Sequence, residues 1–248
     1  MGYQISRFSP RDVAEPAPNR LPQDFDADDR DIWNRVSPYT LTSPECIYSL
    51  CRAVEYVVRG GIPGAFVECG VWKGGSAMAA ALMLVHFGDT SRNLYMYDTY
   101  GVTWPESSDE DVMSNGVTVA ENAANFAAQG WVPEDFYGSP DAVRALILST
   151  GLPESRLHMV VGKVEETIPG VMPESIALLR LDTDWYESTR RELVYLYPRL
   201  VPGGVLMVDD YGSWLGARKA TDAYFAEHNI SMLLHRVDSG GYRIGVKR

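Results

Sequence analysis

The stretch Ala65-Phe-Val-Glu-Cys-Gly-Val-Trp-Lys-Gly-Gly-Ser76 decides the fold class of this 248-residue chain. Its first five residues are mostly apolar, as expected of a strand that is buried on both faces. The glycines that follow predict a tight turn, and the apolar run over 77–87 predicts a helix directly after it. A strand, a glycine-rich turn and a helix in this order form the first part of a βαβ unit.

Strands and helices continue to alternate on both sides of this stretch. Further strands are predicted over 94–97, 157–161, 176–181 and 205–208, and helices over 44–59, 117–128, 141–149, 186–197 and 216–228. The short ranges 232–236 and 242–246 flank a Ser-Gly-Gly turn and predict a hairpin. The pattern indicates an α/β fold with a mostly parallel sheet, helices on both faces and an antiparallel last strand.

Composition excludes several classes of protein. Lys and Arg number 22 against 33 Asp and Glu, a formal net charge of −11, so nucleic acid is not an expected partner. The sequence has neither a run of about 18 apolar residues nor a signal-peptide core, so no membrane association is expected. The three cysteines, Cys46, Cys51 and Cys69, lack metal-binding spacing and favour reduced thiols in the cytoplasm.

Residues 1–40 differ in composition from the rest of the chain, because they are rich in Pro and Asp. They predict an irregular arm or a short helix outside the core. The chain is therefore divided into an N-terminal arm, 1–40, and one domain, 41–248. An arm of this kind can exchange between subunits, which makes a homo-oligomer an expectation to test.

The first turn has the spacing Glu68-x-Gly70-x-x-x-Gly74, and the dinucleotide fingerprint G-x-G-x-x-G is absent. Such a turn lets a ligand approach the backbone and the helix N-terminus. The spacing suits S-adenosylmethionine, which has no pyrophosphate; tight packing of strand against helix is the alternative. Asp98 ends the next strand, where an acid can accept both ribose hydroxyls of a nucleoside cofactor, or simply lie solvated in a loop.

Carboxylates also end two later strands. Asp182 follows 176–181, and Asp209 and Asp210 follow 205–208. Three carboxylates together repel one another unless a proton or a cation neutralises them. Oxygen ligands suit Mg²⁺, with Mn²⁺ or Ca²⁺ as alternatives, whereas capping of the following helices is the purely structural interpretation.

Aromatic residues stand near these acids in the sequence: Trp104, Trp185, Tyr186, Tyr211 and Trp214. They could line a pocket for the apolar face of a sugar or a polyketide, or pack in the core. The loop over 100–115 is long enough to be functional, and we expect it to be mobile without ligands and to close over product with Trp104 inward.

Four motifs follow one another along the chain: residues 66–76, Tyr97-Asp-Thr99, Leu181-Asp-Thr-Asp-Trp-Tyr-Glu-Ser-Thr189 and Val208-Asp-Asp-Tyr-Gly212. In this order they resemble the macrocin O-methyltransferase (TylF-like) family, over a span from about Tyr39 to the C-terminus. That family methylates sugar hydroxyls of antibiotics and other secondary metabolites with S-adenosylmethionine and a divalent cation. The resemblance implies a Rossmann-like, class I methyltransferase fold with seven strands.

The resemblance also implies roles for individual residues. The implied metal ligands are Asp182, Asp209 and Asp210, and the implied base is Asp184. The implied cofactor-binding residues are Thr42, Ser43, Glu68, Gly70, Ser76, Asp98, Gly162 and Lys163. The run Thr-Tyr-Gly-Val-Thr-Trp-Pro over 99–105 and Gly-Ala-Arg over 216–218 depart from the family pattern, which bears on the acceptor and not on the chemistry.

Asp182 and Asp184 are assigned different parts in catalysis. In extended backbone, residues two apart face the same side, so both could reach the site if the strand continues. Asp182 directly ends the apolar run and is expected to hold the metal on which the acceptor docks. Asp184 lies farther out and is expected to take the proton of the acceptor hydroxyl.

These observations predict a Mg²⁺-dependent S-adenosylmethionine O-methyltransferase. Its acceptor would be a deoxysugar hydroxyl of a secondary metabolite or of the nucleotide-sugar precursor. The alternatives are a metal-dependent catechol or phenol O-methyltransferase and a non-catalytic nucleotide-sugar-binding relative. An NAD-dependent dehydrogenase is disfavoured by the glycine spacing.

Overall fold

A sheet of seven strands runs through the computed structural model, which describes residues 21–103 and 106–248. The strand order is β3-β2-β1-β4-β5-β7-β6. The strands are β1 (Ala65–Cys69), β2 (Leu94–Asp98), β3 (Leu157–Val161), β4 (Ile176–Leu181), β5 (Leu200–Val208), β6 (His235–Arg236) and β7 (Arg243–Val246). β1 to β5 pair in parallel, and β7 is antiparallel to β5 and β6. The predicted α/β fold with a mostly parallel sheet and an antiparallel last strand is confirmed.

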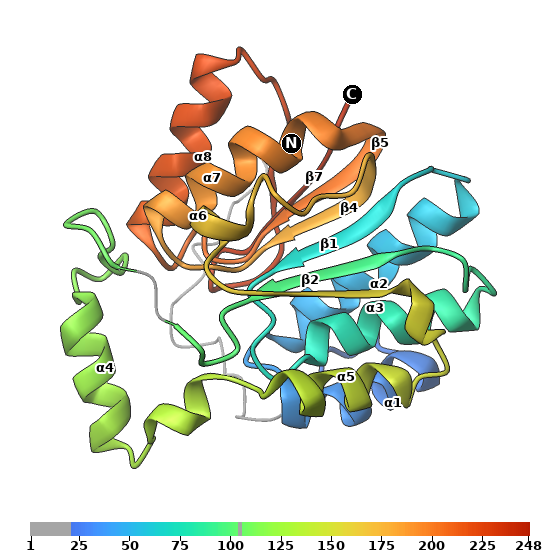
Figure 1. The fold of residues 1–248 in the computed structure, drawn as a ribbon, viewed down its shortest axis with the longest axis horizontal. Helices are drawn as coiled ribbons and strands as arrows, with labels where there is room; N and C mark the ends of the chain where they lie inside the picture. The colour runs from blue at the N-terminus through green and yellow to red at the C-terminus, as the bar shows by residue number, and fades with distance from the viewer. Residues whose placement is uncertain (1–20, 104–105) are drawn as a thin grey trace, which may run out of the picture.

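Helices cover both faces of this sheet (Figure 1). One face carries α1 (Ala27–Val36), α2 (Pro44–Arg59), α3 (Gly75–His86) and α5 (Pro140–Leu148), and the other carries α6 (Val164–Thr167), α7 (Tyr186–Leu196) and α8 (Leu215–Glu227). α4 (Val119–Ala128) stands at the side, apart from both layers. The 3-10 turns among the described residues are η1 (Ser37–Tyr39), η2 (Pro133–Phe136), η3 (Glu154–Arg156) and η4 (Tyr197–Arg199). In the part of the chain that is described, no helix is long and apolar enough to cross a membrane.

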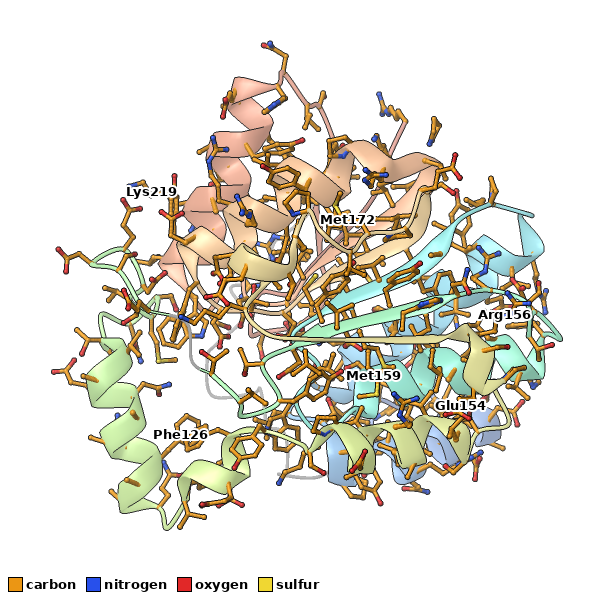
Figure 2. The ribbon with its side chains drawn as sticks, in the orientation of Figure 1. Phe126, Glu154, Arg156, Met159, Met172 and Lys219 are labelled. Carbon is orange, nitrogen blue, oxygen red and sulfur yellow. The ribbon has the colours of Figure 1, made fainter. Side chains whose placement is uncertain are left out.

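The sheet separates two apolar cores, because successive side chains of a strand point to opposite faces. Phe66 of β1 packs with α2 and α3, whereas its neighbour Val67 packs with α7. Met159 and Met172 likewise lie on opposite faces of the sheet (Figure 2). Both faces are therefore buried, which explains why the strands are continuous apolar runs.

The prediction that residues 1–40 lie outside the core is wrong for the described part of that segment. α1 begins behind Asp26, whose side chain accepts a hydrogen bond from the amide of Asp29 while the Asp29 side chain accepts from Asp26. Val36 at its end is completely buried, and Trp33 packs against the same core. The many acidic residues of this segment made the apolar face of α1 difficult to recognise in the sequence. Residues 1–20 lie outside the description, and the domain boundary at residue 40 stays a prediction.

Two strand predictions are wrong at their ends. β5 begins at Leu200 and not at 205, because the amide of Gly203 and the carbonyl of Gly204 both bond to the backbone of Lys247. The predicted turn at Pro202-Gly-Gly204 is therefore part of the strand. β6 is restricted to His235–Arg236, whereas residues 232–234 have no strand assignment.

The topology also indicates where a ligand can bind. β2 and β3 lie on one side of β1, and β4 and β5 lie on the other. The order of the strands thus reverses between β1 and β4. In open parallel sheets, ligands bind beyond the carboxyl ends of the strands at such a point.

Candidate active site

A cavity of about 580 Å³ lies at the carboxyl ends of the strands. Its volume is that of a typical site for small ligands. Of the residues implied by the resemblance, eleven border this cavity: Thr42, Ser43, Gly70, Ser76, Asp98, Gly162, Lys163, Asp182, Asp184, Asp209 and Asp210. The structure thus brings together residues that are up to 168 positions apart, 210 − 42, although their individual roles stay predictions.

Gly70 allows the ends of β1 and β4 to approach each other. Its φ is +83°, and a Cβ atom there would lie 1.7 Å from the carbonyl oxygen of Asp182. No other residue fits at this position. The contact places the glycine-rich turn directly beside the acids that follow β4.

Asp98 ties the first turn to the end of β2. Its carboxylate accepts hydrogen bonds from the amides of Val71 (2.6 Å), Trp72 (2.9 Å) and Tyr100 (2.7 Å). Burial raises its pKa, against the lowering effect of these three bonds. Much of its accepting capacity therefore goes to the backbone, and its contact with a ribose stays a prediction.

Glu68 does not border the cavity but lies beneath it, paired with an arginine that the sequence analysis did not identify. Arg180 is 2% exposed and donates to Glu68 Oε1 at 2.7 Å and Asp182 Oδ2 at 2.7 Å. It also donates to Thr42 Oγ1 at 2.9 Å and lies 3.3 Å from Asp209 Oδ1. Burial raises the pKa of Glu68 to about 7. The available signal was a lone arginine within an apolar strand, which must find acidic partners.

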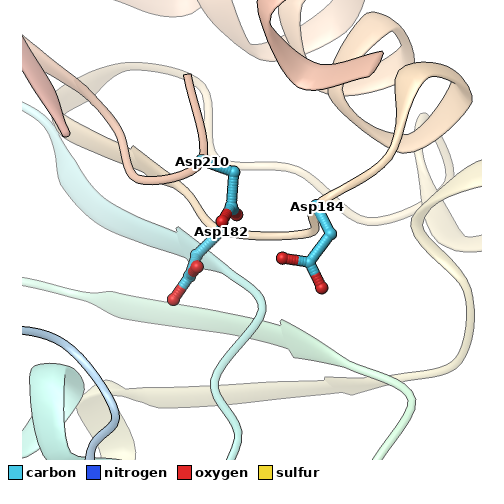
Figure 3. Close-up of side chains that lie close together, drawn as sticks. All are labelled: Asp182, Asp184 and Asp210. Carbon is cyan, nitrogen blue, oxygen red and sulfur yellow. The ribbon is translucent and has the colours of Figure 1, made fainter. Parts of the chain in front are cut away.

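The side chains of Asp182, Asp184 and Asp210 converge, with one oxygen of each within 4.8 Å of the others (Figure 3). Asp209, which the resemblance implies as a ligand in place of Asp184, lies outside this group and against Arg180. The extended-strand argument for Asp184 is wrong, because β4 ends at Leu181 and the φ of Asp184 is +64°. A left-handed turn, and not a continued strand, brings Asp184 to Asp182.

Among the described residues, Arg180 pairs with Asp182, whereas Asp184 and Asp210 have no ion-pair partner. Burial, followed by the charge of Asp182, raises the pKa of Asp184 to about 7. Burial and the charge of Asp184 also raise the pKa of Asp210, whose Oδ2 is buried with no hydrogen-bond partner among the described residues. A divalent cation takes oxygen ligands and would neutralise this excess, so the three side chains fit one.

The aromatic residues near the acids are only partly in the site. Trp185 and Trp214 border the cavity, whereas Tyr186 and Tyr211 do not, and Trp104 lies outside the description. The sequence analysis missed further aromatic residues at the wall of the cavity, among them Phe126, Trp131 and Phe136. The closing motion predicted for 100–115 stays a prediction.

Comparisons with known proteins agree with this architecture. The family model described as Macrocin-O-methyltransferase (TylF) matches residues 11–243. The 8-demethyl-8-(2,3-dimethoxy-alpha-L-rhamnosyl)-tetracenomycin-C 4'-O-methyltransferase of Streptomyces olivaceus is 32% identical over 219 residues, which are 87% of this chain and 79% of that protein. The mycinamicin III 3''-O-methyltransferase of Micromonospora griseorubida is 28% identical over 203 residues, which are 82% of this chain and 76% of that protein.

A solved structure has the same fold. The O-methyltransferase NovP matches with a TM-score of 0.70 at 26% identity, covering 84% of this chain and 82% of that one. The seven-stranded, Rossmann-like fold that the resemblance implies is therefore confirmed, and it is the fold of an O-methyltransferase. Because the family model spans nearly all of the sequence, the chain belongs to the macrocin O-methyltransferase (TylF) family.

Proposed function

We propose that this O-methyltransferase transfers the methyl group of S-adenosylmethionine to a sugar hydroxyl of a secondary metabolite, or of its nucleotide-sugar precursor, and requires a divalent cation. The observation that carries the proposal is the group of Asp182, Asp184 and Asp210 in the same cavity as the turn at Gly70. The curated relatives named above are sugar O-methyltransferases of antibiotics, which supports the acceptor class.

The cofactor would lie along the ends of β1, β2 and β3. S-adenosylmethionine supplies an electrophilic methyl group on a positively charged sulfur. Gly70, Asp98 and Lys163 border the cavity along these strand ends. Asp98 would contact the ribose, and Lys163 would lie on the adenine side. The many acids around the cavity favour a cationic cofactor electrostatically.

Asp182, Asp184 and Asp210 would hold the cation, which we propose is Mg²⁺. Bound there, it would supply positive charge that lowers the pKa of a neighbouring hydroxyl group. Arg180 beneath Asp182 fixes that carboxylate through a 2.7 Å hydrogen bond. The chain therefore holds one ligand rigidly before any cation binds.

Asp184 is the candidate base. A sugar hydroxyl is a weak acid, so the enzyme must remove its proton while it aligns the oxygen with the methyl group. Without a cation, burial and the charge of Asp182 raise the pKa of Asp184 to about 7. A cation bound beside it would lower this pKa and leave the carboxylate ionised, able to accept a proton. Its left-handed turn points the carboxylate at the other two acids and into the cavity.

The proposal is tested with labelled S-adenosylmethionine and a panel of sugars, glycosides, catechols and phenols. We expect label in a sugar hydroxyl, loss of turnover with a chelator and recovery with Mg²⁺. Asp184→Asn should lower kcat by about 10²–10³, the lower part of the range for loss of a general base. Full turnover in metal-free buffer would contradict the metal requirement, and preferential labelling of catechols would replace the proposed acceptor.

We also propose that the protein works in the cytoplasm. Cys46, Cys51 and Cys69 are buried free thiols. Burial raises the pKa of Cys51 to about 12 and that of Cys69 well above its ordinary value, so these thiols are unreactive. This arrangement suits a reducing compartment.

A further inference from the structure

The acid cluster of Asp182, Asp184 and Asp210 depends on a strained turn of the backbone. The amide of Trp185 donates to the carbonyl of Thr183 at 2.7 Å, which closes a three-residue turn around Asp184. With a φ of +64° at Asp184, this is a γ-turn of the rare type that most L-residues avoid. The turn places the carboxylate of Asp184 beside the other two acids (Figure 3). Contacts outside the turn must therefore hold it in this shape.

Glu192 supplies one such contact from inside the protein. The hydroxyl of Thr183 donates to Glu192 Oε1 at 2.9 Å. Glu192 lies in the second turn of α7 and is completely buried. Helical side chains point toward the N-terminus of their helix, so Glu192 reaches back to the turn that precedes α7. The residue between two acids of the cluster is thus fixed by a side chain that does not itself border the cavity.

The surroundings of Glu192 keep its carboxyl group uncharged. The ionisable groups that influence it are Glu165, Cys69 and Asp182, and none of them is a cation. Burial raises the pKa of Glu192 well above its ordinary value, and the charges of Glu165 and Asp182 raise it further. A neutral carboxyl group accepts the hydrogen bond from Thr183 without a counter-ion. A glutamine side chain has a similar shape and can accept the same bond.

An apolar side chain would serve the packing of α7 at least as well as Glu192 does. Leu193 and Leu196 of the same helix are completely buried in the core on that face of the sheet. A buried polar group lowers the stability of a fold unless it makes its hydrogen bonds. The partner that Glu192 does bond, Thr183, borders the cavity. The bond therefore indicates a role in the shape of the site and not in general packing.

We propose that Glu192 is a positioning residue of the active site: through the hydroxyl of Thr183 it holds the γ-turn that presents Asp184 to the cation and the acceptor. The inference rests on the proposed function, because it assumes that Asp184 acts there. Arg180 fixes Asp182 at 2.7 Å, and Glu192 fixes the residue that follows it. Two buried side chains, one charged and one neutral, thus set the arrangement of the acids before a cation binds.

The test compares two variants that remove the bond with one that preserves it. Thr183→Val replaces the hydroxyl with a methyl group, and Glu192→Met removes the acceptor. Each should weaken the binding of Mg²⁺ in calorimetry and lower kcat by about tenfold, the scale of one lost hydrogen bond, with the affinity for S-adenosylmethionine unchanged. Glu192→Gln keeps a neutral acceptor and should retain both values within about twofold of wild type.

The turn itself can be followed without cation or substrate. Selective ¹⁵N-tryptophan labelling reports on the backbone amide of Trp185, and the loss of one signal in Trp185→Phe identifies it. Hydrogen exchange of this amide should be about tenfold faster in Thr183→Val and in Glu192→Met, because the turn opens more often. In Glu192→Gln it should be as slow as in wild type.

The control is Glu187→Met, the same substitution at an exposed position of α7, which should change none of these values. The proposal is disproved if Glu192→Gln behaves like Glu192→Met, or if both bond-removing variants keep the Mg²⁺ affinity and slow exchange of wild type. An equal loss of S-adenosylmethionine affinity and of urea stability in those variants would show a merely structural role and also disprove it. If wild type methylates no sugar or binds no Mg²⁺, the proposed function fails, and the exchange of the Trp185 amide still decides whether Glu192 holds the turn.

Discussion

Asp209 and Asp210 are neighbours in the sequence, but their side chains meet different partners. They directly follow β5, and the side chain of Asp209 lies 3.3 Å from Arg180, which partly compensates its charge. Asp210 joins Asp182 and Asp184 and has an oxygen without a hydrogen-bond partner in the described residues. Two identical side chains thus have different electrostatic environments, which a motif in the sequence does not distinguish.

This difference predicts unequal effects of two matched variants. Asp210→Asn should weaken the binding of Mg²⁺ or Mn²⁺ about tenfold or more, because it removes one of three converging carboxylates. Asp209→Asn should weaken it less, because Asp209 faces Arg180. Calorimetric titration with each cation measures both. A larger loss with Asp209→Asn would restore Asp209 as the ligand and remove Asp184 from that role.

Arg180 predicts a large effect on stability. Its removal leaves Glu68, Asp182 and Asp209 without their shared cation, and breaking a buried ion pair from one side costs about 3–5 kcal/mol. We expect Arg180→Met to lower the free energy of unfolding by about that amount in urea denaturation. Adding Glu68→Gln should recover part of the loss.

The matched control for Arg180 is Arg218, an exposed arginine 3.7 Å from Asp222. Arg218→Met should cost less than about 1 kcal/mol, since exposed ion pairs contribute little. Equal losses for the two variants would show that Arg180 is not a buried counter-charge.

At the scale of elements, the loop after β2 stabilises a helix that is distant in sequence. α7 begins at Tyr186 behind Trp185, which offers no side-chain cap. Asp111, only 2% exposed, supplies one by accepting the Tyr186 amide at 2.7 Å. A Cβ atom on Gly216 would lie 2.2 Å from the same carboxylate, so α8 needs glycine at this point. The loop is thereby attached beside the turn that holds Asp184.

Two different variants should therefore have the same consequence. Asp111→Ala removes the cap, and Gly216→Ala displaces it without changing any charge. Each should lower the free energy of unfolding by about 0.5–2 kcal/mol, the usual value of an N-cap, and should raise the KM for the acceptor. Urea denaturation and steady-state kinetics measure these effects. Asp109→Ala, which changes an exposed acid of the same loop, is the control, and the same losses there would contradict the capping role.

The elements were predictable from the sequence where local pattern alone determines them. β1, β3 and β4 are apolar runs with clear ends, and Ser43 with Pro44 correctly marked the start of α2. The position of α1 in the core was not predicted, because its acidic residues outnumber the apolar residues of its buried face. Arg180 and the Asp111 cap depend on contacts between residues 75–138 positions apart, which no periodicity reveals. The acids of the site were identifiable because they follow strands that the topology places side by side.

At the scale of the whole molecule, the fold buries acids that would prefer to be protonated. Burial raises the pKa of Asp184 and of Glu68 to about 7, whereas in an unfolded chain such groups titrate near 4. Between these values, the folded state holds protons that the unfolded state has released. The free energy of unfolding must then fall as pH rises from about 4 to 7. A cation that binds only the folded acids opposes this loss.

The pH dependence of stability therefore gives the last prediction. Without a divalent cation, the melting temperature should fall between pH 5 and pH 8. A carboxyl group with a raised pKa contributes its full stabilisation below about pH 4, and this contribution is lost as the pH rises through about 7. Added Mg²⁺ should raise the melting temperature little at pH 5, where Asp184 is protonated, and more at pH 8, where it is ionised. Asp184→Asn cannot titrate, so its melting temperature should depend less on pH and respond less to Mg²⁺. Scanning calorimetry of both proteins measures the titration of Asp184 together with its effect on Asp210, whose pKa the charge of Asp184 raises. The wild-type melting temperature could instead change between pH 5 and pH 7 in the same way as that of the variant. Asp184 would then already be ionised in the folded chain, and it would need no cation to become a base.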